Sequence, residues 1–340
     1  MKRTTLCLIF GGKSNEYQVS LSTAYNMLCS LDEGKYDIFV IGITKEGKWY
    51  RVKAKKEAIL EDHWQRGAEP ILIDLNKGAF IAGKSHYKPD KVLLAMHGEM
   101  GEDGRMQGLF DLMGIEYVGC DSFSSSLCMD KHLTKLVARE SGVPVARDIV
   151  VHRGFNEAEV LRKARKLGYP LFVKPCRCGS SVGVTRVRKE AELLEAIFTA
   201  LKYSSKVLVE EEIKGTETEV GVIVRDGKAS ISEIGQLRHS GEFYDYFEKY
   251  EGKRTEYIVP AKISEKTKKE LGECLKKLIF ALEIKDYARF DFFVRENGSL
   301  VFNEVNTLPG FTKDSLFPML YQACGVDRQA LLDLLILHKF

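Results

Sequence analysis

Apolar residues form short continuous runs in the first third of the chain, separated by segments that we interpret as helices. Continuous apolar runs are typical of parallel strands that are buried on both faces. We expect strands at residues 4–10, 37–43 and 91–96, and helices at residues 16–31, 53–63 and 104–113. This alternation predicts a doubly wound α/β unit, which ends near Gly119-Cys120-Asp121.

The remaining two thirds of the chain predict two further blocks. The second has expected helices at 124–141, 156–167 and 189–203, with strands at 148–152 and 171–174. The third has expected strands at 206–210, 217–224 and 229–234, a polar and aromatic loop at 237–259, a helix at 264–282, a hairpin and a C-terminal helix. Loops as long as 237–259 often serve as lids or binding loops. We therefore predict three domains, at residues 1–122, 123–205 and 206–340.

The strongest local signal is a β-hairpin in the third block. The dipeptide Asn297-Gly298 lies between two runs rich in β-branched and aromatic residues, which favours a two-residue hairpin loop. With that loop, Asp291 falls opposite Glu304 and Arg289 falls opposite Asn306. Side chains alternate along a strand, so these four are expected on one face. The other face is expected to be mostly core, and it comprises Phe290, Phe292, Val294, Val301, Asn303 and Val305.

The polar face of this hairpin gathers oxygen ligands. Asp291 and Glu304 would repel each other across the ladder, so a cation between them is the simpler explanation. Carboxylate and amide oxygens, without Cys or His, suit Mg²⁺. Asp291, Glu304 and Asn306 are therefore candidate metal ligands, and Arg289 beside them is a candidate anion-binding group. A solvated, charged hairpin face is the alternative interpretation.

Composition narrows the functional classes. The chain has 340 residues, 29% of them charged, and a net charge of +3, which gives no field that points to nucleic acid or a membrane surface. No apolar stretch is long enough to span a bilayer. The apolar run after Met1-Lys2-Arg3 is too short for a signal peptide, so a buried strand is expected there. The eight cysteines are far apart and Cys176-Arg177-Cys178 lacks metal-site spacing, which favours reduced cysteines in a cytosolic protein.

Three glycine-containing loops follow predicted strands and offer candidate binding groups. Gly11-Gly12-Lys13-Ser14 is not a P-loop, because Cys7 stands where that motif needs glycine; Glu16 after it either holds an ammonium group or complements the helix dipole. The loop 179–183, preceded by Lys174, is either a phosphate-binding loop or an ordinary turn. The acids of the loop 97–104 allow a metal site but are equally well explained by helix capping, and we prefer a substrate-positioning role for His97.

Together these segments resemble the D-alanine–D-alanine ligases of the ATP-grasp superfamily. The resemblance covers nearly the whole chain, and its six motifs occur in the family's order. They are the segments Gly11–Ser20, His97–Gly104, Met129–Lys131, Val173–Gly183, Phe243–Tyr250 and Asn303–Thr312. The implied fold is α/β, with an N-terminal doubly wound, Rossmann-like domain followed by a two-part ATP-grasp fold.

The resemblance also implies roles for individual residues. Those expected at the nucleotide are Lys131, Lys174, Ser181, Glu210, Ile213, Glu217 and Lys249, the last at the γ-phosphate. Those expected in catalysis are Glu16 with Ser180 and Tyr250 in one network, and Arg289 with the Gly310 N–H at developing oxyanions. His97, Ser315 and Leu316 would contact the amino-acid substrates. Asp291, Glu304 and Asn306 would bind two Mg²⁺ ions, with Mn²⁺ as a possible substitute, in agreement with the hairpin interpretation.

The implied activity is ATP-dependent ligation of two D-alanine molecules through an acyl phosphate, for peptidoglycan precursor synthesis. D-alanine–D-serine ligation and another ATP-grasp carboxylate–amine ligation are the alternatives. Leu316 favours D-alanine, because variants that use D-serine or D-lactate usually carry Arg there. There are two departures from the family pattern: Glu211 replaces a lysine that contacts adenine, and the segment Cys176-Arg177-Cys178 replaces Ser-Arg-Glu. The resemblance also suggests a cytoplasmic homodimer.

Overall fold

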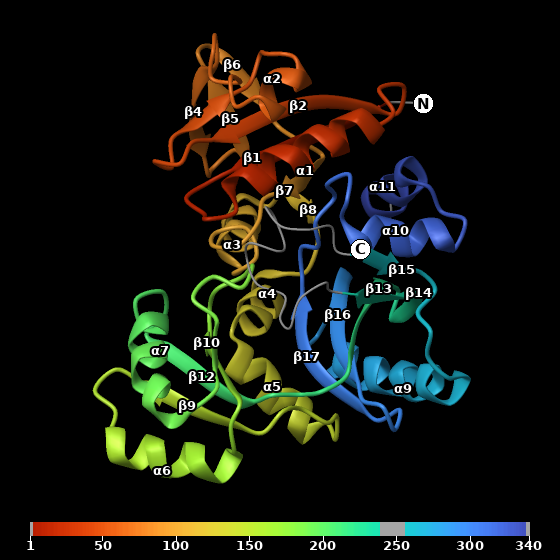
Figure 1. The fold of residues 1–340 in the computed structure, drawn as a ribbon. Helices are drawn as coiled ribbons and strands as arrows, with labels where there is room; N and C mark the ends of the chain where they lie inside the picture. Colours follow the sequence, from red (N-terminus) through yellow and green to blue (C-terminus); the bar gives the residue numbers. More distant parts are fainter. Residues whose placement is uncertain (1–2, 239–255, 338–340) are drawn as a thin grey trace.

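The computed structural model describes residues 3–238 and 256–337. Three sheets organise these residues: one of eight strands, one of four and one of five. Figure 1 shows the N-terminal sheet above the other two, with the four-stranded sheet and the five-stranded sheet side by side beneath it. No helix in the described part of the chain is both long and apolar enough to cross a membrane.

The N-terminal sheet has a parallel half and an antiparallel half, in the order β6-β5-β4-β3-β2-β1-β7-β8. The parallel strands are β1 (Thr4–Gly11), β2 (Tyr36–Ile43), β7 (Lys91–Ala95) and β8 (Glu116–Val118). The helices are α1 (Tyr17–Ser30), α2 (Lys56–Leu60) and α3 (Arg105–Met113). The predicted parallel α/β unit is therefore confirmed, and the predicted helix at 53–63 is only the short α2.

The antiparallel half was not predicted. Its strands are β3 (Trp49–Arg51), β4 (Glu69–Asp74), β5 (Ala79–Ala82) and β6 (Ser85–Tyr87). They are short and carry exposed residues on one side, such as Leu72 and His86. Such segments lack the continuous apolar run by which buried parallel strands are recognised.

The four-stranded sheet has the order β11-β10-β12-β9 and is antiparallel. Its strands are β9 (Asp148–His152), β10 (Leu171–Pro175), β11 (Thr185–Val187) and β12 (Lys206–Glu211), and its helices are α6 (Glu157–Leu167) and α7 (Leu193–Ala200), the latter preceded by the 3₁₀ turn η1 (Glu190–Glu192). We expected the strand at 206–210 in the third block. It instead pairs with β9 and β10, so the predicted boundary between residues 205 and 206 divides this sheet.

The predicted helix at 124–141 is two helices, α4 (Ser122–Met129) and α5 (Lys131–Glu140). Asp130 lies between them with an extended backbone, and its carboxylate accepts the Leu133 N–H (3.2 Å), which caps α5. The same carboxylate holds Lys206 (2.6 Å) and Arg177 (2.8 Å). The break therefore places Lys131 at the first turn of α5, pointing toward the loop that contains Arg177.

The five-stranded sheet has the order β15-β14-β13-β16-β17 and is antiparallel. Its strands are β13 (Thr216–Arg225), β14 (Lys228–Arg238), β15 (Glu256–Ile258), β16 (Asp286–Val294) and β17 (Leu300–Asn306), and the helices near it are α9 (Glu265–Ala281), α10 (Leu316–Ala323) and α11 (Arg328–Leu337). The predicted loop at 237–259 begins and ends in strands β14 and β15, and its residues 239–255 lie outside the described residues.

The β16–β17 hairpin has the predicted register at its polar face but a different turn. The loop has three residues, because the Arg295 N–H donates to the Ser299 carbonyl (2.9 Å) and the Gly298 N–H donates to the Arg295 carbonyl (2.8 Å). Gly298 adopts φ +81°, as the last residue of a three-residue hairpin loop requires. A bulge at Asn303 restores the register, so that Asp291 still faces Glu304.

The core-facing residues of β17 near the turn differ from those that we expected. Phe302 and Leu300 pack in the core with Phe290 and Phe292, where Val301 and Asn303 were expected. The reason is that the longer loop shifts the pairing by one residue near the turn, and such a shift exchanges the two faces of a strand. Asn303 instead lies beside Lys174, within 3.4 Å of its Nζ.

Candidate active site

Two cavities meet where the three sheets converge. One has a volume of about 620 Å³ and lies between the four-stranded and five-stranded sheets, and the other has a volume of about 630 Å³ and lies toward α1. Their shared wall consists of Lys131, Cys178, Gly179, Ser180 and Glu304. A ligand in the first cavity can therefore approach a ligand in the second across this wall.

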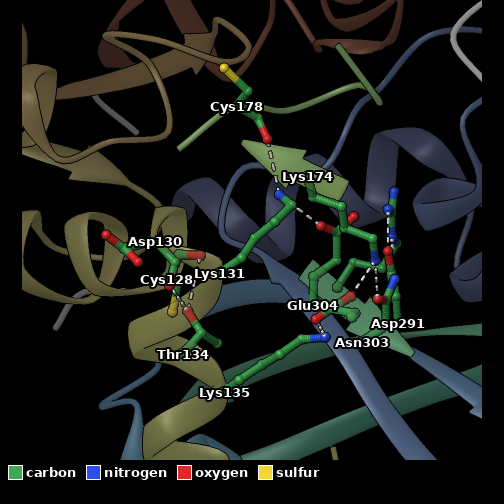
Figure 2. Close-up of polar contacts among 12 residues, drawn as sticks. Cys128, Asp130, Lys131, Thr134, Lys135, Lys174, Cys178, Asp291, Asn303 and Glu304 are labelled. Atoms are coloured by element: carbon green, nitrogen blue, oxygen red, sulfur yellow. Dashed lines mark hydrogen bonds and ion pairs between the residues drawn. The ribbon is translucent and has the colours of Figure 1, made fainter. Parts of the chain in front are cut away.

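The first cavity is lined by lysines and by acidic residues that pair with them. Lys131 Nζ donates to the Cys178 carbonyl (2.9 Å) and lies 3.0 Å from Glu304 Oε2, as Figure 2 shows. Glu304 comes from β17 and Lys131 from α5, so this ion pair joins the helix to the five-stranded sheet. The cavity's other lining residues that sequence analysis selected are Lys174, Ser181, Glu210, Ile213 and Glu217.

The loop after β10 forms the roof of this cavity. Ser180 and Ser181 both have positive φ (+50° and +58°), a conformation that non-glycine residues rarely adopt and that persists only where the surroundings impose it. The Lys131 N–H donates to the Cys176 carbonyl (3.0 Å), so the base of the loop is tied to the start of α5. Arg177, bound to Asp130, adds a second tie. In the segment 176–178, which differs from the family pattern, Cys176 is buried and Arg177 anchors the loop through Asp130.

A buried cluster at the bottom of the first cavity was missed in part by sequence analysis. Lys135 forms an ion pair with Glu210, and Lys174 lies 2.7 Å from the other oxygen of Glu210. Burial opposes ionisation of Glu210, but the two lysines outweigh it and lower the pKa of its carboxyl to about 2. Burial lowers the pKa of Lys135, against the attraction of Glu210. Lys135 looked like any helix-surface lysine, and only the fold shows that it is buried.

The polar face of the hairpin carries a second charged cluster. Arg289 binds both carboxylate oxygens of Asp291 (2.8 Å each) and lies 2.9 Å from Glu219 Oε2. Burial opposes ionisation of Arg289, but these carboxylates raise its pKa well above the ordinary value. Burial raises the pKa of the Asp291 carboxyl, and Arg289 opposes that rise. Glu219 was missed because its place opposite Asp291 depends on the pairing of β13 with β16.

The structure places the three predicted metal ligands on one strand pair, but not all in the cavities. Glu304 lines both cavities and Asn306 lines the second, whereas Asp291 lines neither and faces Arg289. Asn306 Oδ1 accepts the Leu308 N–H (2.9 Å). Within residues 3–238 and 256–337, no group of three or more His, Cys, Asp or Glu side chains is arranged to hold a metal ion.

The second cavity contains Glu16 at its base. Glu16 is the N-cap residue of α1, and its carboxylate accepts a hydrogen bond from the Ser180 hydroxyl of the loop above. A Cβ atom at Gly98 would lie 2.4 Å from Glu16 Oε2, and one at Gly179 would lie 2.9 Å from the same oxygen. Two glycines therefore allow the backbone to enclose this carboxylate.

His97 closes the other side of the second cavity. It is almost fully buried, its Nε2 lies 2.8 Å from Thr23 Oγ1, and its Nδ1 lies 3.4 Å from Glu102 Oε1. Gly310, Ser315 and Leu316 line the same cavity, and the Ser315 hydroxyl accepts the Thr312 N–H (2.9 Å). Leu316 is also part of a small apolar cluster with Leu237 and Leu320. Lys249 and Tyr250 lie outside the described residues.

Comparison with known proteins agrees with this geometry. Residues 5–120 match the family described as D-ala D-ala ligase N-terminus, and residues 137–337 match the family described as D-ala D-ala ligase C-terminus. The D-alanine–D-alanine ligase of Thermoanaerobacter sp. strain X514 is 39% identical over 347 residues, which cover 99% of this chain and 96% of that protein.

Solved structures give the same result. The VanG D-Ala:D-Ser ligase from Enterococcus faecalis is 37% identical with a TM-score of 0.91, and the match covers 98% of this chain and 99% of that one. The D-alanine–D-alanine ligase from Bacillus anthracis complexed with ATP is 31% identical with a TM-score of 0.73, over 98% of this chain and 96% of that one. The predicted ATP-grasp architecture is thereby confirmed. The chain belongs to the D-alanine–D-alanine ligase family of ATP-dependent ligases.

Proposed function

We propose that the protein joins two D-alanine molecules into D-alanyl-D-alanine with conversion of ATP to ADP and phosphate, as a step of peptidoglycan precursor synthesis. The observation that supports this most is the shared wall between the two cavities, where Lys131, Ser180 and Glu304 face both. A phosphate bound at the lysines on one side lies next to an amino acid bound at Glu16 on the other. Transfer of a phosphoryl group to a carboxylate needs such proximity.

The reaction proceeds in two steps in this proposal. The first D-alanine, held by its ammonium group at Glu16 and oriented by the Ser180 hydroxyl, attacks the γ-phosphate of ATP with a carboxylate oxygen, and ADP leaves. The amine of the second D-alanine then attacks the acyl phosphate carbonyl, and phosphate leaves. Arg289 and Gly310 line the second cavity, and in this proposal the Arg289 guanidinium and the Gly310 N–H stabilise the developing oxyanion. Tyr250 and Lys249 keep their predicted roles, in the Glu16 network and at the γ-phosphate.

The nucleotide occupies the first cavity in this proposal. Lys131 and Lys174 contact its phosphates beneath Ser181, and Ile213 and Glu217 line the space for adenosine. Glu210 was expected to line the adenosine pocket, and it does line this cavity. Both of its oxygens bind lysines, so we assign it the task of holding Lys174 in place.

The carboxylate and amide oxygens of the hairpin are suitable ligands for the predicted Mg²⁺ ions. Three carboxylates, from Glu219, Asp291 and Glu304, come together here, and among the described residues Arg289 and Lys131 are cationic partners of this group. Asp291, Glu304 and Asn306 would provide hard oxygen ligands from one strand pair. Bound there, Mg²⁺ would neutralise charge on the nucleotide phosphates. Release of Asp291 from Arg289 would leave Glu219 as the partner of that guanidinium.

D-serine is the second candidate for the second amino acid, because the similar VanG protein is a D-Ala:D-Ser ligase. Leu316 is almost fully buried and provides no hydrogen-bond partner for a serine hydroxyl. An apolar pocket disfavours an added hydroxyl by only about a hundredfold. We therefore expect D-alanine as the main second substrate and slower use of D-serine.

Product analysis tests this proposal. The purified chain is incubated with ATP, Mg²⁺ and an equimolar mixture of D-alanine and D-serine, and the dipeptides are separated and identified by mass. D-alanyl-D-alanine should predominate, with ADP formed in equal amount. Predominance of D-alanyl-D-serine would assign the chain to the second candidate, and a product from other amines would indicate another carboxylate–amine ligase.

Cytoplasmic location and a homodimer stay predictions from the family, and sedimentation velocity tests the predicted homodimer.

A further inference from the structure

Lys135 occupies an unusual place for a lysine. Its side chain is almost fully buried and extends from α5 toward the first cavity (Figure 2). It forms an ion pair with Glu210. Glu210 is equally buried and binds Lys174 through its second oxygen (2.7 Å). One carboxylate therefore serves two lysines, and one positive charge remains in excess at this point.

An excess charge in a buried cluster is unfavourable for folding. The Glu210–Lys174 pair is balanced without Lys135, and burial of a further ammonium group costs free energy that an apolar side chain of similar shape would not. Acidic residues of the same cavity wall have cationic partners of their own: Glu211 pairs with Arg147, Glu212 with Arg186 and Glu304 with Lys131. The nearby Asp148 is already paired with Arg139 (2.6 Å). The excess charge therefore has a use only when an anion occupies the cavity.

We propose that Lys135 is a positioning residue for the nucleotide, which neutralises Glu210 so that Lys174 presents an undiminished positive charge to the phosphates. The proposal rests on the proposed function, because it requires a polyphosphate in the first cavity. Glu210 fixes the place of Lys174, and Lys135 offsets the negative charge with which Glu210 would otherwise cancel Lys174. Lys135 acts through Glu210 and does not itself contact the ligand.

The test compares a ligand that has phosphates with one that lacks them. Binding of ADP and of adenosine is measured by displacement of a fluorescent ADP analogue from the full-length chain and from Lys135→Met, which keeps the length of the side chain and removes its charge. ADP binding should weaken about tenfold, as expected for one partly screened charge. Adenosine binding should stay unchanged.

Two further variants control this comparison. Lys91→Met removes another buried lysine, paired with Glu116 in the N-terminal sheet, and should leave binding of both ligands unchanged. The double variant Lys135→Met with Glu210→Gln removes one positive and one negative charge, and it should recover most of the lost ADP affinity. If Lys135→Met does not fold, as judged by circular dichroism, the double variant still carries the test through its ADP affinity.

Three results would overturn the proposal. They are unchanged ADP binding by Lys135→Met, an equal loss of ADP and adenosine binding, which indicates a deformed cavity, and a double variant whose ADP affinity is no better than that of the single one. A failure of the proposed function would look different. The unsubstituted chain would then fail to bind ADP, or would bind it and form no dipeptide from D-alanine.

Discussion

Asp291 and Glu304 lie directly opposite each other in the β16–β17 ladder, and each is held by a different cation. Arg289, two residues along the same strand, binds Asp291, and Lys131 from α5 binds Glu304. The pair therefore joins the hairpin to the helix that leads into the nucleotide cavity. The proposed metal ligands Asp291 and Glu304 are thereby linked to the proposed oxyanion and phosphate groups. If Asp291 bound a metal ion it would release Arg289, and if Glu304 did so it would release Lys131.

Neutralising either carboxylate should abolish most of the catalysis. In Asp291→Asn and Glu304→Gln we expect turnover to fall by about a hundredfold or more, because charge stabilisation of the transferred phosphoryl group is lost. The measurement is phosphate release with ATP and D-alanine over a Mg²⁺ titration. Glu296→Gln, an exposed residue at the tip of the same hairpin, is the matched control and should behave like the unsubstituted chain. Normal turnover in Asp291→Asn or Glu304→Gln would remove these residues from the metal site.

A methyl group at Gly98 should disturb the proposed ammonium site. Gly98→Ala places a Cβ 2.4 Å from Glu16 Oε2 in a backbone with φ +66°, so we expect a higher KM for D-alanine. Gly114→Ala is the matched control: its φ is +62°, which gives similar strain, and nothing lies within 4 Å of the added Cβ. Steady-state kinetics on both variants separates the contact from the strain. Equal KM values in the two variants would contradict the role of Glu16.

Cys178 should report on occupancy of the cavities, since it lies in their shared wall. Burial raises the pKa of its thiol, and Lys131 opposes the rise, so labelling with a maleimide is best followed at mildly alkaline pH. Saturating ADP should slow labelling of Cys178 and leave the exposed Cys29 unaffected, as read by peptide mass spectrometry. Cys120 and Cys176, whose pKa values burial raises to about 12, should stay unlabelled in the folded protein. Equal labelling of Cys178 with and without ADP would place the nucleotide elsewhere.

The Lys135–Glu210–Lys174 cluster should make the free energy of unfolding depend on pH in the acid range. The pKa of Glu210 is about 2 in the folded chain against an ordinary 4.5, so its contribution is present above about pH 4.5 and is lost as the pH falls toward 2. The difference corresponds to about 3 kcal/mol at most. Urea unfolding between pH 5 and pH 3 should show a smaller loss of unfolding free energy in the double variant Lys135→Met with Glu210→Gln. The same slope in both proteins would indicate that Glu210 titrates normally.

The hairpin shows how far local sequence can determine a site. The pairing of Asp291 with Glu304 was predicted from Asn297-Gly298, although the loop has three residues and Asn303 forms a bulge. The two differences offset each other at the polar face. They could not be foreseen because both are single-residue adjustments, which alternation alone does not reveal.

The missed features depend on contacts between distant segments. Asp130 ends a helix because Lys206 and Arg177 hold its carboxylate, and neither is a sequence neighbour. Lys135 is buried beside Glu210, which lies 75 residues further along the chain on β12. The motifs identified the family and its candidate residues, whereas the partners that fix the charge and position of those residues became visible only in the fold.

Transfer of an isotope is the most direct test of ATP-dependent carboxylate activation by this chain. D-alanine labelled with ¹⁸O in its carboxylate is incubated with the protein, Mg²⁺ and unlabelled ATP, and the released phosphate and dipeptide are analysed by mass spectrometry. Because the labelled oxygen bridges carbon and phosphorus in an acyl phosphate, each phosphate should carry a single ¹⁸O atom, in step with D-alanyl-D-alanine formation. Unlabelled phosphate, or ATP cleavage without dipeptide, would contradict the proposed reaction.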